Sequence, residues 1–81
     1  MLKDLPNLGD YGVKKLNEID VNTPEELRSM GSHEAFVRMR LKDEGCCLHL
    51  LYGLEGAVQG IRKQYLSSDV KKELKEFFDS L

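Results

Sequence analysis

The chain has 81 residues, with 12 Lys or Arg against 14 Asp or Glu, which gives a formal net charge of −2 at pH 7. A chain of this length is expected to form one domain over residues 1–81, and its acidic balance argues against strong unaided nucleic-acid binding, for which a basic domain is typical. No apolar run approaches the ~18 residues that a membrane span requires, and no secretory leader is recognisable, so we expect a cytoplasmic protein without membrane contact.

The first structural unit is predicted between residues 5 and 27, as a turn, a helix and the start of a second helix. A short helical turn is expected ahead of it, because leucines recur at positions 2, 5 and 8. Pro6 has a fixed φ and no N–H, which suits a turn before a helix, and Gly9 can adopt a positive φ. Asp10 is expected to cap a helix over residues 10–19. The apolar face of this helix consists of Val13, Leu16 and Ile19.

Two short helices are predicted next. Thr23 is a strong N-cap signal for a helix over residues 24–30, because a proline occupies the first helical position and a glutamate completes a capping box. Gly31 is a favourable residue for ending this helix. Ser32 is expected to cap a third helix over residues 33–42.

The longest apolar segment, residues 46–61, is predicted to form a central buried helix. Its main apolar stripe follows helical spacing and consists of Cys47, Leu51, Leu54, Val58 and Ile61. A neighbouring stripe would let another backbone approach closely and consists of Leu50, Gly53, Ala57 and Gly60. A last amphipathic helix is expected to begin at Ser67 or Ser68. No strand pattern is present, so the sequence predicts a compact all-α domain of about five helices.

Residues able to form a catalytic or metal site are scarce. Cys46, Cys47 and His49 form the densest cluster, but they lack a fourth metal ligand at a suitable spacing. Adjacent cysteines rarely meet disulfide geometry, so two free thiols and a reducing compartment are expected. No phosphate-binding glycine loop occurs. We therefore predict no metal and no cofactor, and an enzyme is the least favoured of the possible functions.

The turn before the first helix is the remaining candidate site. Backbone N–H groups at a helix start can face an anion, and lysines one turn further along could supplement them. The candidate nucleic-acid-binding residues are Asn7, Leu8, Gly9, Lys14 and Lys15. Five other cations could extend the patch if folding brings them together: Arg38, Arg40, Lys42, Arg62 and Lys63. In the alternative interpretation, the turn only caps its own helix and the lysines are solvated.

Several segments together resemble the C-terminal domain of the TfoX/Sxy competence regulators, over nearly the whole chain. They are Leu5-Pro6-Asn7-Leu8-Gly9, Thr23-Pro24-Glu25-Glu26-Leu27 and Leu50-Leu51-Tyr52-Gly53-Leu54-Glu55-Gly56-Ala57. The first segment is also similar to the hairpin in the C-terminal domain of the bacterial RNA polymerase α subunit. Asp20 departs from the family pattern, which usually has glycine there, although aspartate tolerates the left-handed conformation.

The resemblance implies a bacterial origin, a SAM-like or helix-hairpin-helix fold, and a link to the regulation of DNA-uptake genes. It supplies no catalytic residues. The N-terminal domain of full-length regulators in this family is absent from the sequence. The favoured function is thus a small non-enzymatic regulatory module that contacts the DNA backbone through the hairpin, with or without a transcription-related protein. The alternative is a protein–protein interaction module that does not bind DNA.

Overall fold

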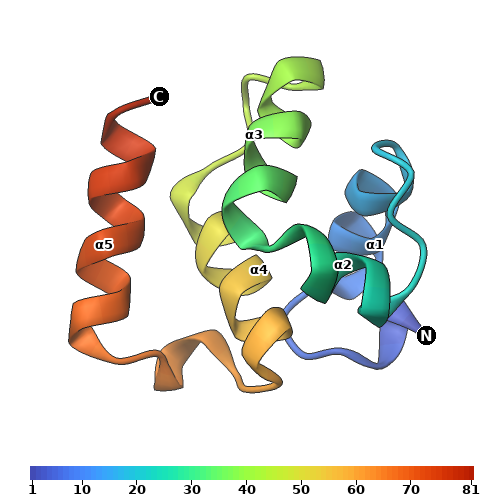
Figure 1. Ribbon diagram of the computed structural model, residues 1–81, viewed down its shortest axis with the longest axis horizontal. Coiled ribbons are helices and arrows are strands. Elements are labelled where there is room, and N and C mark those ends of the chain that lie inside the picture. Colours follow the sequence, from blue (N-terminus) through green and yellow to red (C-terminus); the bar gives the residue numbers. More distant parts are fainter.

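Five α-helices and two short 3-10 helices make up the chain (Figure 1), and the computed structural model describes all of residues 1–81. In chain order the elements are η1 (Leu2–Asp4), α1 (Gly9–Asn17), α2 (Pro24–Met30), α3 (Ser32–Lys42), α4 (Leu48–Gln59), η2 (Lys63–Tyr65) and α5 (Ser68–Asp79). The predicted all-α class and the five helices are confirmed. The SAM-like topology stays a prediction. No helix combines the length and the apolar character needed to cross a membrane.

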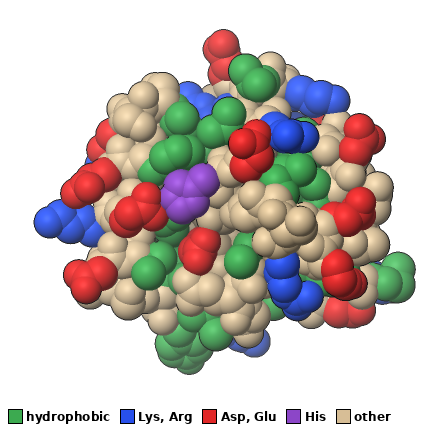
Figure 2. Space-filling model, viewed as in Figure 1, with side chains coloured by type: hydrophobic (Ala, Val, Ile, Leu, Met, Phe, Trp, Pro, Cys, Tyr) green, Lys and Arg blue, Asp and Glu red, His purple; other side chains and the backbone are tan.

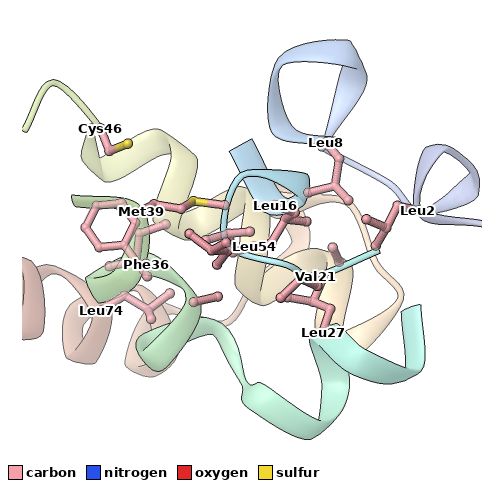
Figure 3. Close-up of a cluster of buried hydrophobic side chains, with 14 of the residues drawn as sticks. Leu2, Leu8, Leu16, Val21, Leu27, Phe36, Met39, Cys46, Leu54 and Leu74 are labelled. Atoms are coloured by element: carbon pink, nitrogen blue, oxygen red, sulfur yellow. The ribbon is translucent and has the colours of Figure 1, made fainter. Parts of the chain in front are cut away.

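The helix α4 occupies the middle of the fold. Figure 1 shows it between α5 on one side and α1 on the other, and α2, α3, α5 and η2 all pack against it. Leu51, Leu54 and Ala57 of α4 are fully buried. Apolar side chains from the other helices, including Leu16 and Phe36, point into the same cluster (Figure 3). Burying each leucine or phenylalanine contributes about 1.5–3 kcal/mol, so this cluster supplies most of the stabilisation.

The helix α4 is shorter than predicted at both ends. It begins at Leu48 rather than Cys46, and Cys47 is its N-cap in extended backbone. Consequently Cys46 is the buried cysteine and Cys47 is exposed, which is the reverse of the predicted stripe. Gly60 ends the helix with a φ of 76°, and the N–H of Ile61 donates back to the carbonyl of Gly56 at 2.9 Å. This is the usual left-handed helix ending, and glycine adopts it without strain.

Two predicted caps are confirmed. The N–H of Glu26 donates to Thr23 Oγ1 at 3.1 Å, and the N–H of Val70 donates to Ser67 Oγ at 3.1 Å. The residue Asp20 adopts the left-handed conformation with a φ of 63°, as its position after α1 predicted. These local bonds explain why α2 matches its predicted bounds and why α5 begins where expected.

Two other predicted caps are wrong. The helix α1 begins at Gly9 and ends at Asn17, so Asp10 lies inside the first turn and does not cap it. Gly31 is the N-cap of α3, and Ser32 is its first helical residue. The hydroxyl of Ser32 instead donates to Glu55 Oε1 on α4 at 2.6 Å, because packing of α3 on α4 brings this carboxylate within reach. A contact between two helices has replaced a local cap at this position.

Candidate nucleic-acid interface

The side chain of Asn7 connects the turn before α1 to two distant parts of the chain. Its Nδ2 donates to the carbonyl of Ile61 at 2.9 Å and to that of Gly53 at 3.4 Å. Its Oδ1 accepts from the backbone N–H of Lys63 at 2.9 Å. The residue has a φ of 73°, which asparagine tolerates better than most residues do. Asn7 therefore satisfies the backbone where α4 ends and η2 begins.

Glycines on α4 make the space that Asn7 occupies. A Cβ added at Gly56 would lie 2.4 Å from Asn7 Nδ2 and 2.8 Å from the carbonyl oxygen of Ile61. A Cβ added at Gly53 would lie 3.4 Å from Asn7 Cβ, which is ordinary contact. Gly53 of the predicted small-residue stripe thus contacts a turn rather than a neighbouring helix, and the most restrictive glycine, Gly56, lies outside that stripe.

The five candidate residues separate into internal and exposed groups. Asn7 uses its side chain on the internal bonds described above, and Leu8 is only 5% exposed and belongs to the hydrophobic core. Any contact that these two residues make with a ligand would have to come from their backbone. Gly9 and Lys14 are exposed. Sequence patterns could not distinguish these groups, because the partners of Asn7 lie 46–56 residues away.

The exposed part of the candidate site lies at the start of α1. Gly9 has a φ of 58° with open space around its Cα, and no side chain caps the first N–H groups of the helix. Lys14 borders a shallow depression of about 530 Å³. The depression is lined by Lys3, Asp10, Val13, Lys14, Asn17 and Glu18. Two lysines therefore face two carboxylates here, so the local charge is close to balanced.

Lys15 is neutralised within the protein. Its Nζ lies 2.9 Å from Asp43 Oδ2 and 3.6 Å from Glu18 Oε1, and its side chain is only 15% exposed. The same ammonium lies 5.5 Å from the centre of the Tyr11 ring. The hydrogen bond that Lys15 Nζ donates to Asp43 raises the pKa of Lys15. The same bond, together with the one donated by the N–H of Gly45, lowers the pKa of Asp43. Lys15 thus joins α1 to the end of α3 instead of facing solvent.

The ion pair between Lys15 and Asp43 predicts a specific pH dependence of stability. Because folding lowers the pKa of Asp43, its stabilising contribution is complete above the unfolded value of about 4 and disappears as the pH falls through the lower folded value. Because folding raises the pKa of Lys15, the contribution also disappears as the pH rises above about 10.4. The difference in melting temperature between wild type and Asp43→Asn should therefore be largest from about pH 5 to 9 and vanish in strong acid.

Thermal unfolding followed by circular dichroism across pH 2–9 measures this difference. The matched control is Glu44→Gln. Glu44 follows Asp43 in the chain, and its carboxylate is exposed and forms no ion pair. A stability difference for Asp43→Asn that stays constant down to pH 2 would show that the charge of Asp43 has no part in it.

Most other cations named as possible extensions of the site have partners of their own. Arg38 donates to Glu34 Oε2 at 2.9 Å, and Lys42 donates to the carbonyl of Glu18 at 2.6 Å. The guanidinium of Arg40 lies 5.0 Å from the centre of the Phe78 ring. On the face shown in Figure 2, acidic and basic side chains are interspersed rather than gathered by sign. Arg38, Arg40 and Lys42 are therefore engaged within the protein rather than left free to extend the candidate site.

A serine, a histidine and two glutamates adjoin at the junction of α3, α4 and α5. His33 Nδ1 lies 3.4 Å from Ser32 Oγ, and His33 Nε2 lies 3.0 Å from both carboxylate oxygens of Glu73. The Ser32 hydroxyl, however, directs its proton to Glu55 rather than to His33, and the residue is only 2% exposed. A buried hydroxyl bound to a carboxylate is not arranged as a nucleophile with a base beside it. The group holds three helices together.

The two cysteines are free thiols, as predicted. Burial raises the pKa of the Cys46 thiol, which lowers its reactivity. The ring of His49 lies 6.2 Å from that of Tyr52 in an edge-to-face arrangement, so this histidine pairs with an aromatic ring. No group of three or more His, Cys, Asp or Glu side chains is placed to hold a metal ion.

Comparison with known proteins decides the family. A family model described as the TfoX C-terminal domain matches residues 1–78. The chain belongs to the TfoX C-terminal domain family. It is 34% identical over 80 residues to the protein Sxy of Escherichia coli K12, covering 99% of this chain and 38% of Sxy. The chain thus spans well under half the length of this relative. Membership assigns it to a competence-related regulatory family.

Two crystal structures from Listeria monocytogenes share the fold of this TfoX-type domain. One is of an uncharacterised protein, with a TM-score of 0.96 and 46% identity, covering 98% of this chain and 90% of that chain. The other is of a protein of unknown function, with a TM-score of 0.96 and 45% identity, covering 99% of this chain and 98% of that chain. The similarity to these two structures supports the arrangement of helices around α4 and does not indicate a ligand.

Proposed function

We propose that this domain is a non-catalytic module of a cytoplasmic competence regulator and that it contacts the phosphate backbone of DNA through the start of α1. The observation that carries this proposal is the exposed helix start at Gly9, where no side chain caps the backbone N–H groups and Lys14 lies one turn further along. Helix starts of this kind bind anionic groups through their N–H donors and the helix dipole. Family membership supports a regulatory role.

The geometry also limits the strength of this contact. Of the lysines near the turn, only Lys3 and Lys14 border the depression without an ion-pair partner, and two carboxylates border it with them. Two phosphate contacts on duplex DNA give a dependence of log K on log salt concentration with a slope of about −2. The proposal is therefore weak, sequence-independent binding that a transcription-related partner would reinforce.

Replacing Lys14 by glutamine should weaken DNA binding and make the salt slope less negative by about 1. Fluorescence anisotropy with a labelled duplex, titrated at several salt concentrations, measures both quantities. The matched control is Lys72→Gln, which removes an exposed and unpaired lysine from α5. Absence of binding at low salt, or equal slopes for wild type and Lys14→Gln, would refute the DNA proposal.

A second candidate function is a protein-interaction module. Leu41 near the end of α3 is 82% exposed, and it borders an open groove of about 520 Å³. Val37 and Leu81 supply the rest of its apolar lining, and Arg40 and Glu44 flank it. If this groove accepts a second copy of the chain, sedimentation velocity should detect a dimer that Leu41→Ser abolishes. A monomer at all concentrations would exclude self-association.

A further inference from the structure

A groove on the surface formed by α4, η2 and α5 is lined by residues that the proposed function does not use. Its volume is about 250 Å³. The lining residues are His49, Tyr52, Lys63, Gln64 and Lys71. None of them is acidic, although the chain has more acidic than basic residues, 14 against 12. The groove therefore carries positive charge that its own walls do not neutralise.

The two lysines of this groove are exceptional among the cations of the protein. Four basic side chains belong to half-buried residues: Lys15, Arg40, Lys63 and Lys71. Lys15 is neutralised by Asp43, and Arg40 stacks on the rings of Phe36 and Phe78. Lys63 and Lys71 have neither an ion pair nor a stacking partner. Partial burial strengthens electrostatic attraction to a ligand, so an uncompensated pair of ammonium groups favours an anion at this position.

We propose that this groove binds a phosphate-bearing anion, with the ammonium groups of Lys63 and Lys71 as its charged donors. A phosphate group carries between one and two negative charges near neutral pH and has several strong acceptor oxygens, which suits two lysines in one groove. Neutral donors are also present in the side chains of Gln64 and Tyr52. The Tyr52 hydroxyl makes only a long bond of 3.5 Å to the carbonyl of Lys71, so a ligand oxygen can compete for it.

The two lysines of the groove lie on different elements, Lys63 on η2 and Lys71 on α5. The backbone N–H of Lys63 donates to Asn7 Oδ1, so the turn before α1 fixes the start of η2. Lys71 lies in the first turns of α5, whose start is capped by Ser67. Substituting either lysine side chain leaves both of these backbone bonds intact. The groove is distinct from the start of α1, so phosphate binding here does not depend on the DNA contact proposed above.

Titration of the isotope-labelled chain with inorganic phosphate, followed by amide chemical shifts, tests the proposal. The expected result is saturable shifts at residues 49, 52, 63, 64 and 71. Lys63→Gln and Lys71→Gln should each raise Kd about tenfold or more, because each removes one charge-assisted bond, and the double variant should abolish binding. Lys72→Gln is the matched control next to Lys71 and should leave Kd unchanged.

Further arms identify the source of the phosphate and the outcomes that overturn the proposal. If a 5′-mononucleotide shifts the same amide resonances with a lower Kd than inorganic phosphate does, the ligand is a free nucleotide. If a short single-stranded oligonucleotide does so instead, the ligand is a nucleic acid. Absence of saturable shifts, equal shifts with sodium acetate, or equal weakening by Lys72→Gln would each overturn it. Lys14→Gln should leave phosphate binding unchanged, so this proposal and the DNA contact fail separately.

Discussion

Replacing Asn7 by alanine should lower the free energy of unfolding by about 3–4 kcal/mol, a large fraction of the roughly 4–12 kcal/mol expected for a domain of this size. The variant loses the bonds to Ile61 and Lys63, both 2.9 Å long, and leaves a part-buried N–H and carbonyl without their partner. Each of these two lost bonds costs about 1 kcal/mol. Alanine at a φ of 73° adds about 1–2 kcal/mol of backbone strain.

Urea denaturation followed by circular dichroism measures this loss. Asn7→Gly is the matched variant, because glycine accepts the positive φ but makes none of the three bonds. It should be about 1 kcal/mol more stable than Asn7→Ala, and the remaining deficit measures the bonds themselves. A loss below about 1 kcal/mol for Asn7→Ala would show that water replaces the side chain, and that Asn7 does not secure the turn.

Replacing Gly56 by alanine should destabilise the protein by about 2–4 kcal/mol, even though alanine has the better intrinsic helix propensity by about 1 kcal/mol. The new Cβ would lie 2.4 Å from Asn7 Nδ2, 2.8 Å from the carbonyl oxygen of Ile61 and 3.3 Å from the N–H nitrogen of Lys63. Two of these neighbours are backbone atoms and the third is held by hydrogen bonds, so none can move without breaking the contacts that Asn7 makes.

Gly53→Ala is the matched control on the same helix. Its Cβ would approach Asn7 Cβ and the Asn7 carbonyl oxygen no closer than 3.4 Å, so the variant should lie within about 1 kcal/mol of wild type. The same denaturation measurement compares the two variants. The double variant Asn7→Gly, Gly56→Ala should lose less unfolding free energy than the sum of the losses of the two single variants, because both substitutions act on the same contact. Equal stability of the two alanine variants would contradict the steric account.

The sequence alone determined the features of this protein that depend on neighbours three or four residues away. The caps at Thr23 and Ser67 and the left-handed residue Asp20 each involve a side chain and backbone groups within one turn, so the local pattern is sufficient to predict them. The apolar spacing around Leu51 and Leu54 likewise predicted a buried central helix, because helical periodicity repeats over a short window.

Only the tertiary structure decided which candidate residues of the site are free to act. Asn7 and Leu8 are turned inward, Lys15 is paired with a residue 28 positions away, and Ser32 has exchanged a local cap for a carboxylate on another helix. Each outcome depends on packing between helices, where a distant partner with a well-placed carbonyl or charge outweighs a weaker local bond. Local sequence patterns carry no information about such partners, so the turn before α1 could be predicted from the chain, while the role of Asn7 as an internal anchor could not.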